Sequence, residues 1–178
     1  MKKITTPLTM DIIEDLEAGD EVYISGKIYT MRDAAHQKIY DMIQKKEKLP
    51  FDLKNQVIYY CGPTPAKDGN VIGACGPTTS SRMDKYTPLL LKNGLKGMIG
   101  KGERSVEVKD AIKKYKAVYF AALGGLGALY ADNVKNAKVI AFPELGPEAV
   151  YEMDVEDFYA IVINDAHGND YYVMNRYN

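Results

Sequence analysis

The chain has little of what many functional classes require. Its 178 residues include no tryptophan, two cysteines and two histidines. Two thiols are too few for a four-thiolate metal site, and two histidines make a histidine-rich metal site unexpected. So few cysteines suit a reducing compartment, and we expect the protein in the cytoplasm.

An excess of charge of one sign is also missing. Lys and Arg total 23 against 24 Asp and Glu, a formal net charge of -1. A general basic footprint for nucleic acid is therefore absent, and we expect no nucleic-acid partner. No apolar run approaches the ~20 residues that span a bilayer, and the first residues contain no apolar signal-peptide core. We therefore expect neither a membrane association nor a leader.

Short apolar segments alternate with helical patterns along the chain, which favours an α/β fold. We expect helices over 9–16, 33–48, 79–92 and 105–115 and one ending near 134, with strands over 22–25, 28–30, 57–60, 71–75, 97–99, 117–123, 138–142 and 161–163. Gly26 resembles a hairpin turn, and residues 165–169 resemble the tip of a second hairpin that returns through 171–173. The acidic run 152–157 is expected on a solvated helix or loop. We expect one domain over residues 1–178, with a mixed, curled or barrel-like sheet and flanking helices.

Four segments place polar residues beside a glycine or a helix start, namely 30–36, 60–64, 76–83 and 99–102. Each alone is explained by a turn and a helix cap. Three of them carry one cation each, Arg32, Arg82 and Lys101, and two would present backbone N–H groups at a helix N-terminus. Together they predict a site for a small polyanion. A guanidinium binds a carboxylate bidentately, so a dicarboxylate would use two such groups.

Phosphate is the competing anion, but the nucleotide motifs are missing. Lys101 is followed by Gly102 rather than by Ser or Thr, so residues 99–102 do not form a Walker loop. The string Gly124-Gly125-Leu126-Gly127 lacks the G-x-G-x-x-G spacing. We interpret it as a tight turn between a strand and a helix.

The cysteines and histidines each allow two interpretations. Cys61 and Cys75 could include a nucleophile paired with His36, or could be buried thiols at strand ends. His36 could face the site or pack locally within its helix. His167 lies in the expected hairpin tip and is interpreted as a solvated turn residue.

The four segments, in this order, resemble the β subunit, or C-terminal domain, of the iron–sulfur-dependent class I fumarases and L-tartrate dehydratases. The matching segments are residues 32–36, 60–63, 76–84 and 99–102, and two further matches follow at residues 122–125 and 162–170. The resemblance covers nearly the whole chain. It implies a swivelling β/β/α domain, which agrees with the mixed sheet expected above.

The resemblance implies half of a hydro-lyase that interconverts (S)-malate and fumarate plus water. In this family a separate α subunit, or an N-terminal domain, holds a 4Fe–4S cluster through three cysteines. The cluster is therefore expected on a partner α subunit, with no metal on this chain, in a hetero-oligomer with two copies of each chain. The implied roles are a base for Thr78, binding of the substrate carboxylates for Arg32, Arg82 and Lys101, and secondary roles for Asp33, His36, Gly100 and Gly102.

Three alternatives remain at this point. Thr78 could be a helix cap, because a free threonine hydroxyl is a poor base unless nearby charges assist it. The substrate could be L-tartrate or another short hydroxy diacid, since the same cations would serve. The chain could also be a non-catalytic module that binds small anions.

Overall fold

The computed structural model describes residues 1–176. Its strands are β1 (Lys2–Thr5), β2 (Glu21–Thr30), β3 (Val57–Tyr59), β4 (Gly97–Gly100), β5 (Val118–Ala121), β6 (Val134–Ala141) and β7 (Val150–Asn164). Its helices are α1 (Met10–Asp15), α2 (Asp33–Gln44), α3 (Thr87–Lys92), α4 (Val106–Tyr115), α5 (Gly127–Asp132) and α6 (Tyr171–Met174), with 3-10 turns η1 (Ser80–Met83) and η2 (Pro143–Glu148). None of the helices in the described range is long and apolar enough to cross a membrane.

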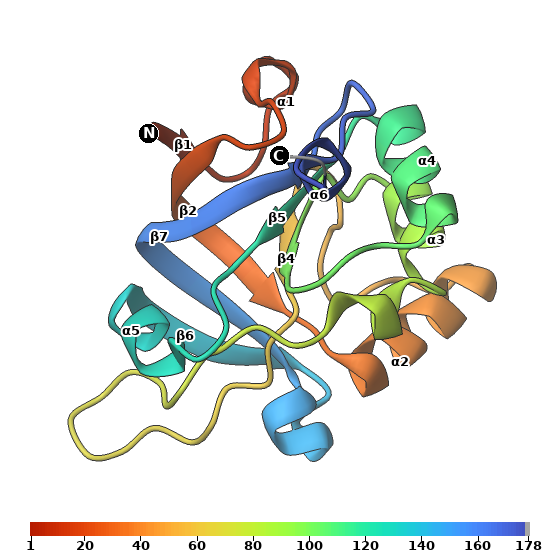
Figure 1. The fold of residues 1–178 in the computed structure, drawn as a ribbon. Helices are drawn as coiled ribbons and strands as arrows, with labels where there is room; N and C mark the ends of the chain where they lie inside the picture. Colours follow the sequence, from red (N-terminus) through yellow and green to blue (C-terminus); the bar gives the residue numbers. More distant parts are fainter. Residues whose placement is uncertain (177–178) are drawn as a thin grey trace.

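The sheet is mixed and closes on itself (Figure 1). Strands β2, β3, β4 and β5 are parallel neighbours, and β7 pairs antiparallel with both β5 and β2. These five strands therefore form a closed barrel, with β1 added beside β2 and β6 beside β7. The mixed, barrel-like α/β sheet with flanking helices that the sequence predicts is confirmed.

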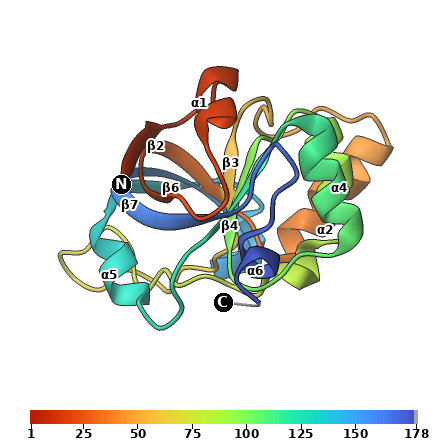
Figure 2. The ribbon, with the colours of Figure 1, turned by 45° about the horizontal axis from the view of Figure 1, so that its top comes forward.

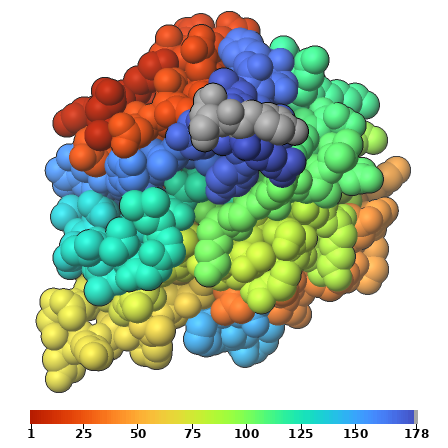
Figure 3. Space-filling view, viewed as in Figure 1, coloured from red at the N-terminus to blue at the C-terminus, as the bar shows by residue number. Residues whose placement is uncertain are grey.

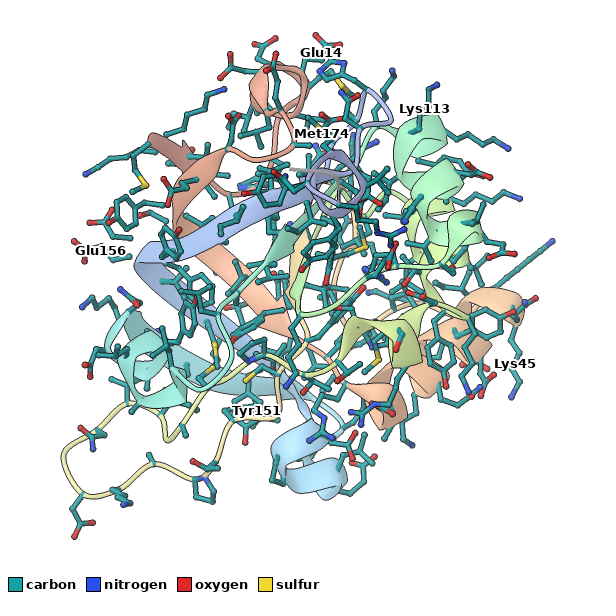
Figure 4. The ribbon with its side chains drawn as sticks, in the orientation of Figure 1. Glu14, Lys45, Lys113, Tyr151, Glu156 and Met174 are labelled. Atoms are coloured by element: carbon teal, nitrogen blue, oxygen red, sulfur yellow. The ribbon has the colours of Figure 1, made fainter. Side chains whose placement is uncertain are left out.

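Successive side chains of the barrel strands pack into two different cores, because they point to opposite faces of a strand. Tyr59 and Phe120 belong to the inner cluster, whereas their neighbours Ile58 and Tyr119 belong to an outer one. Helices α2, α3 and α4 lie together along one side of the barrel and cover the outer cluster (Figure 2). Charged side chains at the periphery, such as those labelled Lys45, Lys113 and Glu156, point outward (Figure 4).

Two helix starts confirm the caps that the sequence predicts. Thr9 precedes α1, and its side chain accepts a hydrogen bond from the N–H of Ile12. Ser105 precedes α4, and its hydroxyl accepts from the N–H of Val108 at 3.2 Å. Both side chains satisfy amide groups that a helix start leaves without partners. The expected helix over 79–92 is interrupted, and consists of η1 followed by α3.

The hairpin expected around Gly26 is wrong, because β2 is continuous. Gly26 has a φ of +118° and lies where the register between β2 and β7 shifts. A Cβ at this position would lie 2.9 Å from the backbone oxygen of Thr6. The glycine therefore marks a bulge where two backbones come close, rather than a turn.

The acidic run 152–157 is part of the long strand β7, not of a solvated helix or loop. Met153 and Val155 are buried, while Glu152 lies between Lys27 and Lys138 on neighbouring strands, at 3.3 and 3.5 Å. Cross-strand lysines thus compensate the carboxylates, which explains how so acidic a segment enters a sheet.

Two other expected strands are absent from the described part of the chain. Residues 71–75 follow an irregular path, as the end of a long loop that protrudes from the body of the molecule (Figure 3). Residues 171–174 form α6 rather than the return strand of a hairpin, because Asp170 caps a helix start at that point. His167 is exposed in the preceding turn, as expected.

Candidate active site

Three of the four predicted segments follow directly from neighbouring parallel strands. Since β2, β3 and β4 are parallel, their carboxyl ends lie at one edge of the barrel. The N–H of Met31 donates to the carbonyl of Tyr59 at 3.1 Å, and the N–H of Tyr60 donates to the carbonyl of Ile99 at 2.8 Å. The segments that carry Arg32, Tyr60 and Lys101 therefore lie side by side.

The fourth segment crosses the same edge. The N–H of Thr78 donates to the carbonyl of Tyr60 at 2.7 Å, and the N–H of Ser80 donates to the carbonyl of Lys101 at 2.9 Å. Thr79 and Lys101 also form an isolated parallel bridge. Backbone hydrogen bonds thus gather all four predicted segments at one place.

Arg32 is half-buried against the glycine of the second segment. A Cβ on Gly62 would lie 2.8 Å from Cδ of Arg32 and 3.0 Å from one of its terminal nitrogens, so a side chain at this position would displace the guanidinium. The Nε of Arg32 is buried and has no hydrogen-bond partner within residues 1–176. An unsatisfied buried donor of this kind is stabilised when an acceptor, such as a ligand oxygen, reaches it.

Asp33 and Arg82 form an ion pair between the first and third segments. The Nε of Arg82 lies 3.2 Å from Oδ2 of Asp33, and both side chains are nearly half exposed. Solvent screening makes such a pair weak. Asp33 therefore contacts Arg82 and leaves its guanidinium accessible from solvent.

His36 is buried under the first segment. Its Nδ1 lies 2.9 Å from the carbonyl oxygen of Arg32, so Nδ1 carries the proton and donates it. The ring packs edge-on against Tyr60 and stacks on Tyr86. Burial lowers the pKa of His36 to about 4, which keeps the imidazole neutral at pH 7. The histidine supports the backbone of Arg32 from the interior.

The two secondary glycines serve different purposes. Gly100 is buried at the end of β4, where a Cβ would overlap the hydroxyl of Ser80 and lie 2.7 Å from the ring of Tyr60. Gly102 has a φ of +89° with open space around it. Gly100 allows the third segment to approach β4, and Gly102 allows the chain to turn after Lys101.

Both helix starts at this edge have backbone donors that the chain itself occupies. The N–H of Ala34, in the first turn of α2, donates to Oε1 of Glu148 at 3.4 Å, and the N–H of Ser80 is bound to Lys101. Glu148 ends η2, a segment for which the sequence analysis predicted no element. Anion binding here would therefore depend mainly on the cationic side chains.

Thr78 is half-buried and does not act as a helix cap. The residue that precedes η1 is Thr79, which makes no side-chain capping bond. Within the described residues, no hydrogen bond of the Thr78 hydroxyl is seen, whereas its backbone is fixed to Tyr60. The backbone of Thr78 is therefore fixed, and its hydroxyl has no hydrogen-bond partner among residues 1–176.

Sequence analysis missed one cation that organises this edge from within. The side chain of Arg104 is fully buried, and its Nε donates to Asp84 at 2.7 Å. One terminal nitrogen donates to Tyr60 at 3.1 Å and to Thr87 at 2.9 Å. Asp84 follows η1, and Arg104 follows the turn at Gly102, so the pair joins the third and fourth segments. Local sequence contains no signal for this role.

Cys61 and Cys75 contact each other rather than a histidine. Their sulfur atoms are 3.2 Å apart in the core. The contact with Cys75 and burial raise the pKa of Cys61 well above its ordinary value, so Cys61 is a thiol at neutral pH. This geometry favours the interpretation as buried thiols. Within residues 1–176, no group of three or more His, Cys, Asp or Glu side chains could hold a metal ion.

The chain is thus a mixed α/β barrel in which the segments that carry Arg32, Thr78, Arg82 and Lys101 meet at one edge. The family model described as "Fumarase C-terminus" matches residues 2–175, and the chain belongs to this family.

Relatives of two lengths are similar to the chain. A Methanocaldococcus jannaschii protein named as an L(+)-tartrate dehydratase subunit beta is 43% identical over 171 residues, which cover 93% of this chain and 88% of that protein. Fumarate hydratase 2 of Leishmania major is 42% identical over 156 residues, and the anaerobic class I fumarate hydratase of Escherichia coli is 40% identical over 151 residues. The chain spans 28% of the length of each of these two fumarate hydratases.

Proposed function

We propose that this chain is the β subunit of a hydro-lyase that interconverts (S)-malate and fumarate plus water. The observation that carries the proposal is the convergence of the segments bearing Arg32, Thr78, Arg82 and Lys101 at one barrel edge. Membership in the fumarase C-terminus family supports the same reaction class. The convergence also supports a substrate with more than one carboxylate, since single cations arrive from three separate segments.

In this proposal the three cations bind the carboxylates of the substrate. Arg32 offers a buried Nε that lacks a partner in the described range, and Arg82 is oriented by Asp33. Lys101 is exposed at the end of β4 and contributes a point charge. His36, Gly100 and Gly102 act indirectly, through the backbone of Arg32 and the path of the chain around Lys101.

Thr78 is the proposed base for the proton on the carbon next to a carboxylate. A threonine hydroxyl holds little anion at neutral pH, so this role requires nearby positive charge. Arg32 and Lys101 belong to segments hydrogen-bonded to those around Thr78 and would stabilise the negative charge that grows as the proton leaves. A carboxylate from a partner chain could assist the proton transfer.

An iron–sulfur cluster does not fit the described residues of this chain. The two cysteines contact each other in the core, and no third ligand joins them within residues 1–176. We therefore place the 4Fe–4S cluster on an α subunit and propose a cytoplasmic assembly with two copies of each chain. The subunit name of the Methanocaldococcus relative supports a partner chain.

L-tartrate is the second candidate substrate. It is favoured by the relative named as a tartrate dehydratase subunit beta, of whose length the chain covers 88%. Turnover of malate and of tartrate by the same reconstituted two-chain enzyme would separate the candidates. The chain alone should be inactive on both, and activity of the chain alone would contradict the need for a partner.

Thr78→Ala tests the proposed base in the reconstituted enzyme. We expect turnover to fall at least ~100-fold, the usual scale for loss of a general base, with the thermal midpoint nearly unchanged. Thr78→Ser keeps the hydroxyl and should retain a good part of the activity. The control is Thr9→Ala, which removes a true helix cap and should cost about 1 kcal/mol of stability with turnover preserved. Turnover near wild type in Thr78→Ala would exclude Thr78 as the base.

A further inference from the structure

The loop that joins β3 to the Thr78 segment begins and ends at a cysteine. Cys61 directly follows the hydrogen-bonded residue Tyr60, and Cys75 precedes Gly76 and Pro77. The residues from Thr64 to Val71 are exposed, and this stretch protrudes from the body of the molecule (Figure 3). The cysteines, in contrast, are 1% and 0% exposed within the inner core.

The base of this loop is already closed by backbone pairing. The N–H of Thr64 donates to the carbonyl of Ala74 at 3.0 Å, and the N–H of Gly73 donates to the carbonyl of Thr64 at 3.0 Å. The N–H of Ala74 donates to the Thr64 hydroxyl at 2.7 Å. The carbonyl of Cys75 accepts from the hydroxyl of Tyr59 at 2.6 Å, which fixes Cys75 beside β3.

The two sulfur atoms meet directly below this pairing, at 3.2 Å. A disulfide needs its sulfur atoms about 2 Å apart, so thiols that the fold already holds in contact need only a small further approach. We propose that Cys61 and Cys75 form a reversible disulfide that clamps the base of the 62–74 loop. This modification site is independent of the proposed hydro-lyase reaction.

The oxidant in this proposal is a low-molecular-weight disulfide such as oxidised glutathione. One protein thiol loses its proton and attacks a glutathione sulfur, which forms a mixed disulfide and releases one glutathione thiolate that takes up a proton. The second protein thiol, as thiolate, attacks the protein sulfur of the mixed disulfide and releases the second glutathione. The protein loses two electrons and two protons, and the glutathione disulfide gains both.

Burial sets the conditions under which the first step occurs. The raised pKa of Cys61 makes its thiolate scarce while the loop is closed. Exchange therefore requires the loop to open. This opening is a local unfolding event, because residues 64–71 are already exposed. The second step is intramolecular between adjacent sulfurs, so a mixed disulfide should not accumulate.

The test uses the reduced chain of residues 1–178, which is incubated with excess oxidised glutathione, quenched with acid and analysed by mass spectrometry. We expect the loss of two hydrogens, no glutathione adduct, and full reversal by dithiothreitol. Trypsin cuts after Lys67, between the two cysteines, so the oxidised protein should give peptide 55–67 joined to peptide 68–82. In the reduced protein these peptides should separate.

Cys75→Ala is the matched control, because it leaves Cys61 without its partner. This variant should stop at the glutathione adduct on Cys61 or remain reduced, and Cys75→Ser gives the same test if the alanine variant does not fold. The proposal is overturned if a glutathione adduct persists on the wild-type chain or if disulfides form between two chains. A separate sample of dithiothreitol in the same buffer shows that the oxidant is active. The proposal is also overturned if this dithiothreitol becomes fully oxidised while Cys61 and Cys75 can both still be alkylated.

Discussion

Replacing Arg104 by methionine should destabilise the protein strongly, because its guanidinium is fully buried and every strong contact is polar. It donates to Asp84, Tyr60 and Thr87, and it lies over the rings of Tyr60 and Tyr119 at 5.2 and 4.8 Å. Arg104→Met keeps much of the apolar stem but leaves the Asp84 carboxylate without its counterion. Burial lowers the pKa of Arg104, whereas Tyr60 and the Asp84 carboxylate raise it. The pKa of Arg104 is raised overall.

The magnitude follows from the burial of the pair. Asp84 is 14% exposed and Arg104 is 0% exposed in their side chains. Removing one partner of such a pair costs about 3–5 kcal/mol, a large share of the ~5–15 kcal/mol that stabilises a typical domain. In a protein of this size that loss lowers the thermal midpoint by roughly 6–20 °C.

Urea unfolding followed by far-UV circular dichroism measures the effect, since the chain has no tryptophan for fluorescence. The midpoint should fall with little change in slope. Arg82→Met is the matched control: its pair with Asp33 at 3.2 Å is nearly half exposed and should contribute at most about 1 kcal/mol. If Arg104→Met lies within about 1 kcal/mol of wild type, the buried pair does not hold the third and fourth segments together and this reasoning is wrong.

Two further predictions concern the residues around Arg32. Burial lowers the pKa of His36 from 6.5 to about 4. Between these two pH values the unfolded chain binds a proton at His36 that the folded chain does not bind. The contribution of neutral His36 to the free energy of unfolding should therefore be fully present above pH 6.5, and about 2 kcal/mol of it should be lost by pH 5. His36→Leu should remove this part of the pH dependence. The control is His167→Gln, because His167 is exposed. Gly62→Ala places a Cβ 2.8 Å from Arg32 and should raise KM in the reconstituted enzyme more than it changes the thermal midpoint. Gly124→Ala meets no atom within 4 Å and should leave both values unchanged.

The helices and most strands of this fold could be predicted because local chemistry defines their ends. Ser105 caps α4 and the pattern of apolar residues after it places the helix correctly. The turn predicted at Gly26 is wrong because glycine occurs equally in a turn and in a bulge. The difference depends on the backbone of Thr6, which approaches from a segment distant in sequence.

The strand β7 shows a second limit of local reasoning. Its residues alternate between buried Met153 and Val155 and the acidic neighbours Glu152 and Asp154, so a period of two was present in the sequence. The acidic composition suggested a solvated surface instead. Lysines on neighbouring strands make the alternation stable, and their positions are known only after the strands are paired.

The convergence of the predicted segments could be expected from the sequence because three of the four follow parallel strands directly. Parallel neighbours bring their carboxyl ends to one edge whatever the detail of the loops, so the segments that carry Arg32 and Lys101 lie at the same edge, on either side of β3. Arg104 could not be identified in the same way, because its role arises from burial and from contacts with Asp84, Tyr60 and Thr87, which lie far from it in the sequence. The chain has 23 Lys and Arg residues. Their burial and hydrogen-bond partners distinguish a cation that stabilises the fold from one whose donors are available to an anion. Arg104 has its donors satisfied by the protein, whereas Arg32 keeps a buried donor without a partner in the described range, and Arg82 and Lys101 remain open to solvent. The proposed binding of a small polyanion therefore rests on the cationic groups that the fold leaves without a buried partner, and not on the net charge of the chain.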